Sequence, residues 1–265
     1  IHESLLRDLL REASEMNLSQ CPPAVGQKLH RRLRQMCGFA DPYSKVKYRF
    51  NTMALEMLPD LSTGVENAND PLLHALRLAI AGNVIDLGVK GGIGEGEIRS
   101  AIQNTLNEPF HGDIDDFRAS VKEAQCILYL ADNAGEIVFD RLLIEQLPRE
   151  HVTLAVRGAP ILNDAILEDA KIAGLCSMVE VIDNGSDAPG TILSDCSESF
   201  RRRFDEADLI IAKGQGNFET LSDVESNIYF LFKTKCPVIA SHIGLPVGTH
   251  VATRSKSLSA AMGGD

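Results

Sequence analysis

The amino-acid sequence predicts an α/β protein, a three-layer α/β/α sandwich with a mostly parallel sheet that follows an N-terminal helical subdomain. From residue 125 onward, short apolar runs alternate with helical stretches. This alternation is typical of βαβ units, whose sheet is covered by helices on both faces. Before residue 110, apolar residues recur at helical spacing instead. We therefore expect the helical subdomain over residues 1–110 and the sandwich over residues 111–265.

Leucine spacing and prolines define the helices expected in the first part of the chain. Pro22 and Pro71 stand where helices should open, because proline is favoured at the first helical position. Pro59 should stop the helix that precedes it. The expected helices cover residues 4–16, 22–33, 42–58, 72–80, 97–106 and 114–122, with a glycine-rich loop at 88–96.

The sheet is expected from five apolar runs, which are short enough to be buried strands. They cover residues 126–131, 151–156, 178–182, 209–212 and 237–240. The helices expected between these strands cover residues 135–146, 164–173, 196–204 and 218–222.

Charge and composition exclude some classes of protein. The net charge of −11 argues against a nucleic-acid binder, because affinity for phosphate backbones depends on basic surface. No apolar stretch approaches the roughly 20 residues needed to cross a bilayer, and no signal-peptide pattern opens the chain. The six cysteines show no C-x-x-C spacing, which favours reduced thiols in a cytoplasmic enzyme.

Three side chains with oxygen atoms directly follow the first expected strand. They are Asp132, Asn133 and Glu136. The carboxyl ends of parallel strands are where open α/β sheets bind ligands, and carboxylate and amide oxygens suit Mg²⁺ or Mn²⁺ better than zinc. A plainer interpretation is that Asp132, and likewise Asp164, caps the helix that follows it. Capping leaves Asn133 and Glu136 unexplained, so the cluster as a whole favours a metal site.

Three later strand ends carry similar polar, glycine-rich segments, at residues 157–164, 183–191 and 213–219. Parallel strands bring all four segments to one edge of the sheet, where their polar groups can converge. Lys213 could be an ordinary solvated lysine. However, it precedes Gly214 and Gly216, which would let the backbone approach a ligand while lysine adds a compact positive charge. Residues 91–96 are not a dinucleotide fingerprint, because no strand precedes them.

Four motifs together resemble the damage-control phosphatase family, formerly called domain of unknown function 89, and in particular its compact prokaryotic branch. The motifs are Asp132-Asn133-Ala134-Gly135-Glu136, Pro160-Ile161-Leu162-Asn163-Asp164-Ala165, Lys213-Gly214-Gln215-Gly216-Asn217-Phe218-Glu219 and Gly82-Asn83-Val84-Ile85-Asp86. The resemblance implies a metal-dependent phosphatase that acts on small phosphometabolites, often sugar phosphates. It also implies that Asp132, Asn133 and Asp164 hold the divalent cation and that Lys213 contacts the phosphate.

The other expected substrate contacts are Asn83, Arg157, Gly214, Gly216, Asn217 and Glu219. Asn83 and Asp86 should reach the site from the helical subdomain and face Asp132. The chain departs from the family pattern in two ways. It lacks the usual early C-x-x-C pair, so we expect further residues before Ile1, and Ile166 stands where relatives tend to have threonine.

The expected chemistry is in-line attack of water on a phosphate monoester, assisted by Mg²⁺, Mn²⁺, Co²⁺ or Ni²⁺. Glu136 and Asp86 are both candidates for proton transfer, and a nucleophilic role for Asp132 would compete with metal binding.

Two other functions stay open: an S-adenosylmethionine-dependent protein-carboxylate methyltransferase and a non-catalytic phosphosugar-binding protein. The expected partner is a small phosphorylated metabolite, not a nucleic acid or a membrane. The sequence also allows a homo-oligomer.

Overall fold

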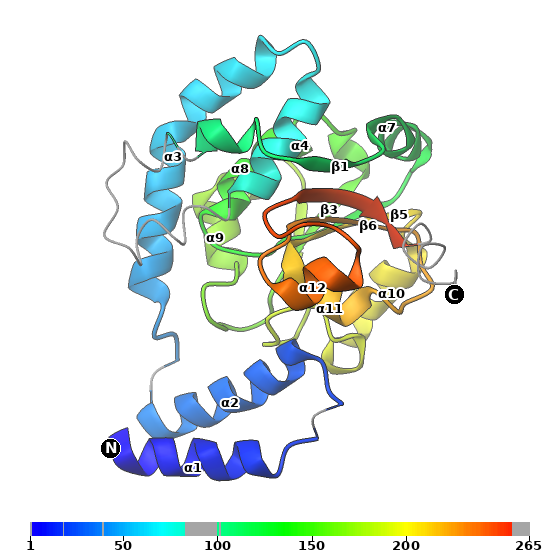
Figure 1. Ribbon diagram of the computed structural model, residues 1–265. Coiled ribbons are helices and arrows are strands. Elements are labelled where there is room, and N and C mark those ends of the chain that lie inside the picture. Colours follow the sequence, from blue (N-terminus) through cyan, green and yellow to red (C-terminus); the bar gives the residue numbers. More distant parts are fainter. Residues whose placement is uncertain (1, 18, 39, 83–99, 101, 256–265) are drawn as a thin grey trace.

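The computed structural model describes residues 2–17, 19–38, 40–82, 100 and 102–255. Within these residues the chain forms an α/β/α sandwich around a mostly parallel sheet (Figure 1), which confirms the predicted fold class. No helix of the described residues is long and apolar enough to cross a membrane.

The described strands form a seven-stranded sheet in the order β1-β7-β6-β5-β2-β3-β4. The five strands from β6 to β4 are parallel to one another, whereas β7 is antiparallel to β6 and parallel to β1. The chain passes from β2 outward to β4 and then returns to the other side of β2 as β5, so the strand order reverses between β2 and β5. The strands are β1 Phe110–Gly112, β2 Ile127–Leu130, β3 Val152–Val156, β4 Glu180–Asp183, β5 Leu209–Lys213, β6 Ile228–Lys233 and β7 His250–Arg254.

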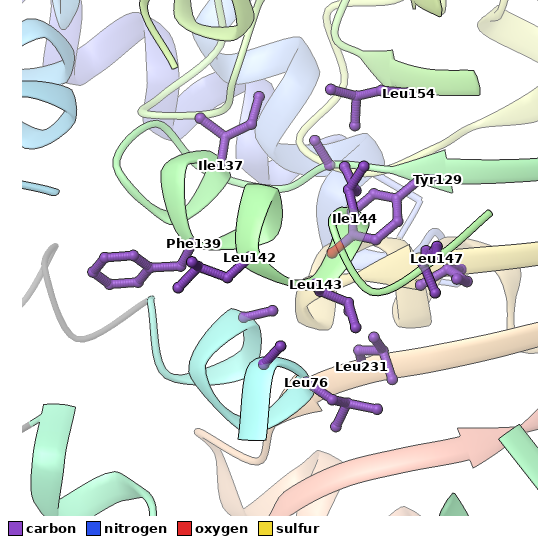
Figure 2. Close-up of a cluster of buried hydrophobic side chains, with 14 of the residues drawn as sticks. Leu76, Tyr129, Ile137, Phe139, Leu142, Leu143, Ile144, Leu147, Leu154 and Leu231 are labelled. Carbon is purple, nitrogen blue, oxygen red and sulfur yellow. The ribbon is translucent and has the colours of Figure 1, made fainter. Parts of the chain in front are cut away.

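Side chains alternate along the central strands between two hydrophobic cores, one on each face of the sheet. On β2, for example, Tyr129 joins the core beneath one helical layer and Leu128 joins the core beneath the other. The first layer consists of α3 Ser44–Glu66, α4 Pro71–Ala81, α7 Ile114–Glu123, α8 Glu136–Ile144 and α9 Leu167–Ile172. The second consists of α10 Glu198–Glu206, α11 Gly214–Leu221 and α12 Pro237–His242. Figure 2 shows part of the first core, where Leu76 of α4 and Leu143 of α8 gather with Leu231 of β6.

The N-terminal helices α1 His2–Ser14 and α2 Pro22–Cys37 form a pair beside the sandwich (Figure 1). Polar side chains attach α2 to the loop after β4. Gln27 donates to Asp187 Oδ1 at 2.8 Å and to Asp195 Oδ2 at 2.7 Å, and Arg31 pairs with the same two carboxylates. Farther along the helical region, α4 packs against α8 and β6.

Three details differ from the expectations. Helix α3 continues through Pro59 to Glu66, because Ala54, Met57 and Val65 on its buried face pack into the core on both sides of the proline. Residues 237–240 form helix α12 and not a strand, since Pro237 opens a helix that Cys236 caps. Strands β1, β6 and β7 had not been predicted.

Candidate active site

The loops after β2 and β3 are joined to one another at the carboxyl edge of the sheet. Ala134 N donates to Asn163 O at 2.8 Å, and Ala165 N donates to Asp132 O at 2.8 Å. These bonds place Asn133 opposite Asp164 in an antiparallel bridge. Neither aspartate caps a helix, because α8 begins after Gly135 and α9 begins after Ile166. The capping interpretation therefore fails for both acids.

The loop after β5 completes this edge at the point where the strand order reverses. Gly214 lies directly against the Asp132 carboxylate, and a Cβ atom at residue 214 would come within 2.0 Å of Asp132 Oδ2. The backbone at Gly214 also has a φ of +80°, which glycine adopts most readily. Position 214 thus requires glycine for two reasons, and the aspartate lies at the reversal point where open α/β sheets bind ligands.

The amide of Asn133 has a defined orientation. Its Nδ2 donates to Asp132 Oδ2 at 2.7 Å and to Glu136 Oε2 at 3.3 Å. Because both bonds use the nitrogen, the Oδ1 atom is the part of the amide that can act as a metal ligand.

Arg157 is buried behind the two aspartates. Its Nε donates to Asp164 Oδ2 at 2.8 Å, and its Nη1 donates to Asn217 Oδ1 at 3.2 Å. The third nitrogen, Nη2, is buried without a hydrogen-bond partner among the described residues and lies 3.8 Å from Asp132 Oδ1. Arg157 therefore holds Asp164 in place and keeps a donor available beside Asp132.

Lys213 is fully buried and points into the first helical layer. Its Nζ donates to Ala79 O at 2.8 Å, to Glu136 Oε1 at 2.8 Å and to Asp140 Oδ1 at 2.5 Å. Burial opposes the charge of Lys213, but Asp140 and Glu136 outweigh burial and raise the pKa of this lysine. An ammonium has three N–H donors. A direct contact with phosphate, as predicted, would therefore require Lys213 to release one of these partners.

Negative charge predominates among the buried groups at this edge. Around the loops after β2, β3 and β5, the described residues include five buried carboxylates, Asp132, Glu136, Asp140, Asp164 and Asp169, and three buried cations, Lys47, Arg157 and Lys213. Burial, followed by the charges of Glu136 and Asp164, raises the pKa of Asp132 to about 8. Burial also raises the pKa of Asp164, against the effect of Arg157, and raises that of Asp140 to about 6.

A divalent cation fits this donor set, because it would offset the two excess negative charges and because its preferred ligands are oxygens. The described residues contain no group of three or more His, Cys, Asp and Glu side chains that could hold a metal ion. The predicted set therefore consists of two carboxylates and one amide, those of Asp132, Asp164 and Asn133.

The remaining predicted residues have varied surroundings. Gly216 packs against the backbone of Pro189, where a Cβ atom would meet the carbonyl oxygen at 2.4 Å. Asn217 is buried and donates to Lys213 O at 2.7 Å, so it fixes the start of α11. Glu219 is half-buried and accepts a hydrogen bond from Gln215 at 2.7 Å. Asn83 and Asp86 lie outside the described residues.

Lys235 is a candidate site residue that the sequence reasoning missed. It is exposed, and its charge acts on Asp132 to lower the pKa of that acid. Lys235 follows β6 much as Lys213 ends β5, so the same rule of strand ends would have identified it. The rule was not applied because β6 itself, the run Ile228–Lys233, had not been recognised as a strand.

The fold and these side chains define a class: an α/β protein with an acidic, oxygen-rich site at the reversal point of a mostly parallel sheet. The family model described as the damage-control phosphatase ARMT1-like domain matches residues 2–251. The chain belongs to this family, which confirms the resemblance inferred from the motifs.

Relatives cover most of the chain. A damage-control phosphatase from Archaeoglobus fulgidus is 39% identical over 86% of this chain and 81% of its own length. An uncharacterized protein from Methanocaldococcus jannaschii is 43% identical over 88% of this chain and 80% of its own length. The crystal structure of a DUF89 family protein from Pyrococcus horikoshii matches with a TM-score of 0.84 and 35% identity, over 95% of this chain and 87% of that chain.

Proposed function

We propose that this protein is a metal-dependent phosphatase that hydrolyses small phosphate monoesters such as sugar phosphates, as part of metabolite damage control. One observation carries the proposal: Asp132, Asn133 and Asp164 converge beside Nη2 of Arg157, which has no hydrogen-bond partner among the described residues. The site thus combines oxygen ligands with a buried donor for an anion. Relatives named damage-control phosphatases support the same activity.

Asp132, Asn133 Oδ1 and Asp164 are the residues that would hold the cation, which we propose to be Mg²⁺, Mn²⁺, Co²⁺ or Ni²⁺. When bound, such a cation polarises a phosphoryl oxygen and lowers the pKa of a coordinated water.

Arg157 and Lys235 are the proposed contacts for the phosphoryl group. Nη2 of Arg157 makes no hydrogen bond within the part of the chain that the structure describes and lies beside Asp132. The guanidinium cannot move far, because Asp164 and Asn217 hold two other nitrogens. Lys235 adds an exposed positive charge that lowers the pKa of the same acid. Donors fixed in advance stabilise developing charge without reorganising during the reaction.

Lys213 acts on the same site through Glu136. Its ammonium holds Glu136 Oε1, and Glu136 Oε2 in turn accepts from the amide of Asn133. This chain of bonds keeps Asn133 Oδ1 free for the cation. Glu136 and Asp86 both remain candidates for proton transfer, Glu136 because it lies next to Asn133. The six cysteines are free thiols, which agrees with the cytoplasmic setting we propose.

The test is a phosphate-release screen over a panel of sugar phosphates and other phosphometabolites. Wild type should release phosphate with at least one of the four cations and stop when EDTA removes it, and Asp132→Asn should be inactive. Methyl transfer from S-adenosylmethionine to protein carboxylates, measured on the same preparation, should be undetectable. Methyl transfer without phosphate release would support the methyltransferase alternative, and tight phosphosugar binding without turnover would support a binding protein.

A further inference from the structure

Helix α3 contributes two residues to a buried polar triad. The triad lies beneath the loops after β2 and β3, which carry the proposed cation ligands and are called the ligand loops below. The triad consists of Lys47, Asn51 and Asp169, exposed by 2%, 0% and 3%. Lys47 and Asn51 are four residues apart, so they lie on the same face of α3. Asn51 Nδ2 donates to Asp169 Oδ1 at 2.8 Å, and Lys47 Nζ lies 2.8 Å from Asp169 Oδ2.

The two ends of the Asn51 amide lead to different loops, Oδ1 directly to the loop after β2 and Nδ2 through Asp169 of α9 to the loop after β3. Its Oδ1 accepts the N–H of Gly135 at 2.7 Å, two residues after Asn133. Its Nδ2 reaches Asp169, whose other oxygen accepts the N–H of Ile166 at 2.9 Å, two residues after Asp164. One side chain from α3 therefore connects the loop after β2 to the loop after β3.

The contact at Gly135 is close enough to fix the first loop. Gly135 has a φ of +80°, and a Cβ atom there would lie 2.9 Å from the Cβ of Phe50. Glycine thus allows α3 to pack directly on the loop, and the buried N–H of Gly135 then faces Asn51. An apolar residue at position 51 would leave that N–H buried without a partner, which is costly.

The separation of the two loops determines whether Asp132, Asn133 and Asp164 can share one cation. Two backbone hydrogen bonds, Ala134–Asn163 and Ala165–Asp132, join the loops to each other. Asn51 connects the same loops from beneath.

We propose that Asn51 is a positioning residue for the cation site, setting the spacing of the two ligand loops and thereby the affinity for the divalent cation. This inference rests on the proposed function, because it presupposes that the cation binds between these loops. Asn51 itself touches neither the cation nor the substrate. Residues that orient metal ligands in this indirect way typically change metal affinity by about 10–100-fold when they are mutated.

The experiment measures Mn²⁺ affinity from the rise in melting temperature as Mn²⁺ is added to the metal-free protein, without any substrate. Asn51→Ala should weaken the apparent affinity by about tenfold or more, and saturating Mn²⁺ should restore part of the turnover. Asn51→Ser, which is a milder truncation with similar helix propensity, should act in the same direction if the alanine variant folds poorly. Met57→Ala is the control, because Met57 is a buried residue six positions further along α3 whose loss weakens packing in the core.

The inference is supported if the Asn51 variants lose Mn²⁺ affinity while Met57→Ala, although it melts earlier, keeps the wild-type affinity. Wild-type affinity in the Asn51 variants, or an equal loss in Met57→Ala, would overturn the inference and leave the proposed function standing. If Mn²⁺, Mg²⁺, Co²⁺ and Ni²⁺ all fail to stabilise the wild type, the proposed metal site is wrong and this inference fails with it.

Discussion

Replacing Lys213 with methionine tests whether this buried lysine serves the protein interior or the phosphoryl group. Methionine keeps much of the side-chain volume but removes the charge that Glu136 and Asp140 share. Both carboxylates are buried, and removing one partner of a buried ion pair typically costs about 3–5 kcal/mol. That is a large part of the roughly 5–15 kcal/mol by which a domain is stable.

The loss of unfolding free energy in Lys213→Met should be larger at high pH than at low pH. Asp140 already has a pKa raised to about 6 by burial, although Lys213 opposes the shift. Without the lysine this pKa rises further, so near pH 5.5 the acid is protonated and the variant recovers part of its stability. As the pH rises through this higher pKa, the acid ionises, the uncompensated charge appears and the variant loses that stability. Urea unfolding of the metal-free wild type and variant at pH 5.5 and pH 8 measures the loss of unfolding free energy at each pH.

Lys235→Met is the matched control, because Lys235 is an exposed lysine at the next strand end. It should change stability by no more than about 0.5 kcal/mol while lowering kcat/KM. If Lys213→Met instead unfolds within about 1 kcal/mol of wild type and loses activity by about 10²–10³-fold, our reasoning is refuted and Lys213 is a direct phosphate contact.

Three further predictions concern the site itself. Gly214→Ala should abolish cation binding by displacing the Asp132 carboxylate, whereas Gly38→Ala, with a similar positive φ but open space around it, should only lower the melting temperature. Arg157→Lys should lower kcat/KM by about 10²–10³-fold, because an ammonium cannot replace the fork that holds Asp164 and Asn217; unchanged kinetics would contradict this. The contribution of Asp132 to the stability of the cation-free protein should fall as pH rises from about 4 to 8, since the folded pKa of Asp132 lies above its unfolded value. Asp132→Asn should reduce that slope in urea unfolding series, and an unchanged slope would count against the assignment.

The sequence predicted the parts of the structure that depend on local pattern. The βαβ alternation placed β2, β3, β4 and β5 correctly, and their polar ends then indicated the site without knowledge of any contact. The part of helix α3 beyond Pro59 was not predicted. Burial of Met57 and Val65 outweighs the local cost of the proline, and this burial depends on tertiary contacts that the local sequence does not reveal. The run at residues 237–240 was misassigned because a short apolar run fits a strand or a helix equally well.

The candidate site was predictable only in part, for a similar reason. Asp132, Asn133 and Asp164 follow strands and could be identified by that position. The partners of Lys213 could not, since Ala79 O and Asp140 come from α4 and α8, which meet only in the folded core. Asn51 carries no local signal of its role either, because its two partners are 84 and 118 residues away.

The most direct measurement is the anomalous diffraction of crystals grown with Mn²⁺, on wild type and Asp132→Asn. The proposed site requires one Mn²⁺ peak in the wild type, with oxygens of Asp132, Asn133 and Asp164 at about 2.0–2.6 Å, and no peak in the variant. A peak held by other side chains, or an unchanged peak in Asp132→Asn, would contradict a metal-dependent phosphatase site at this edge of the sheet.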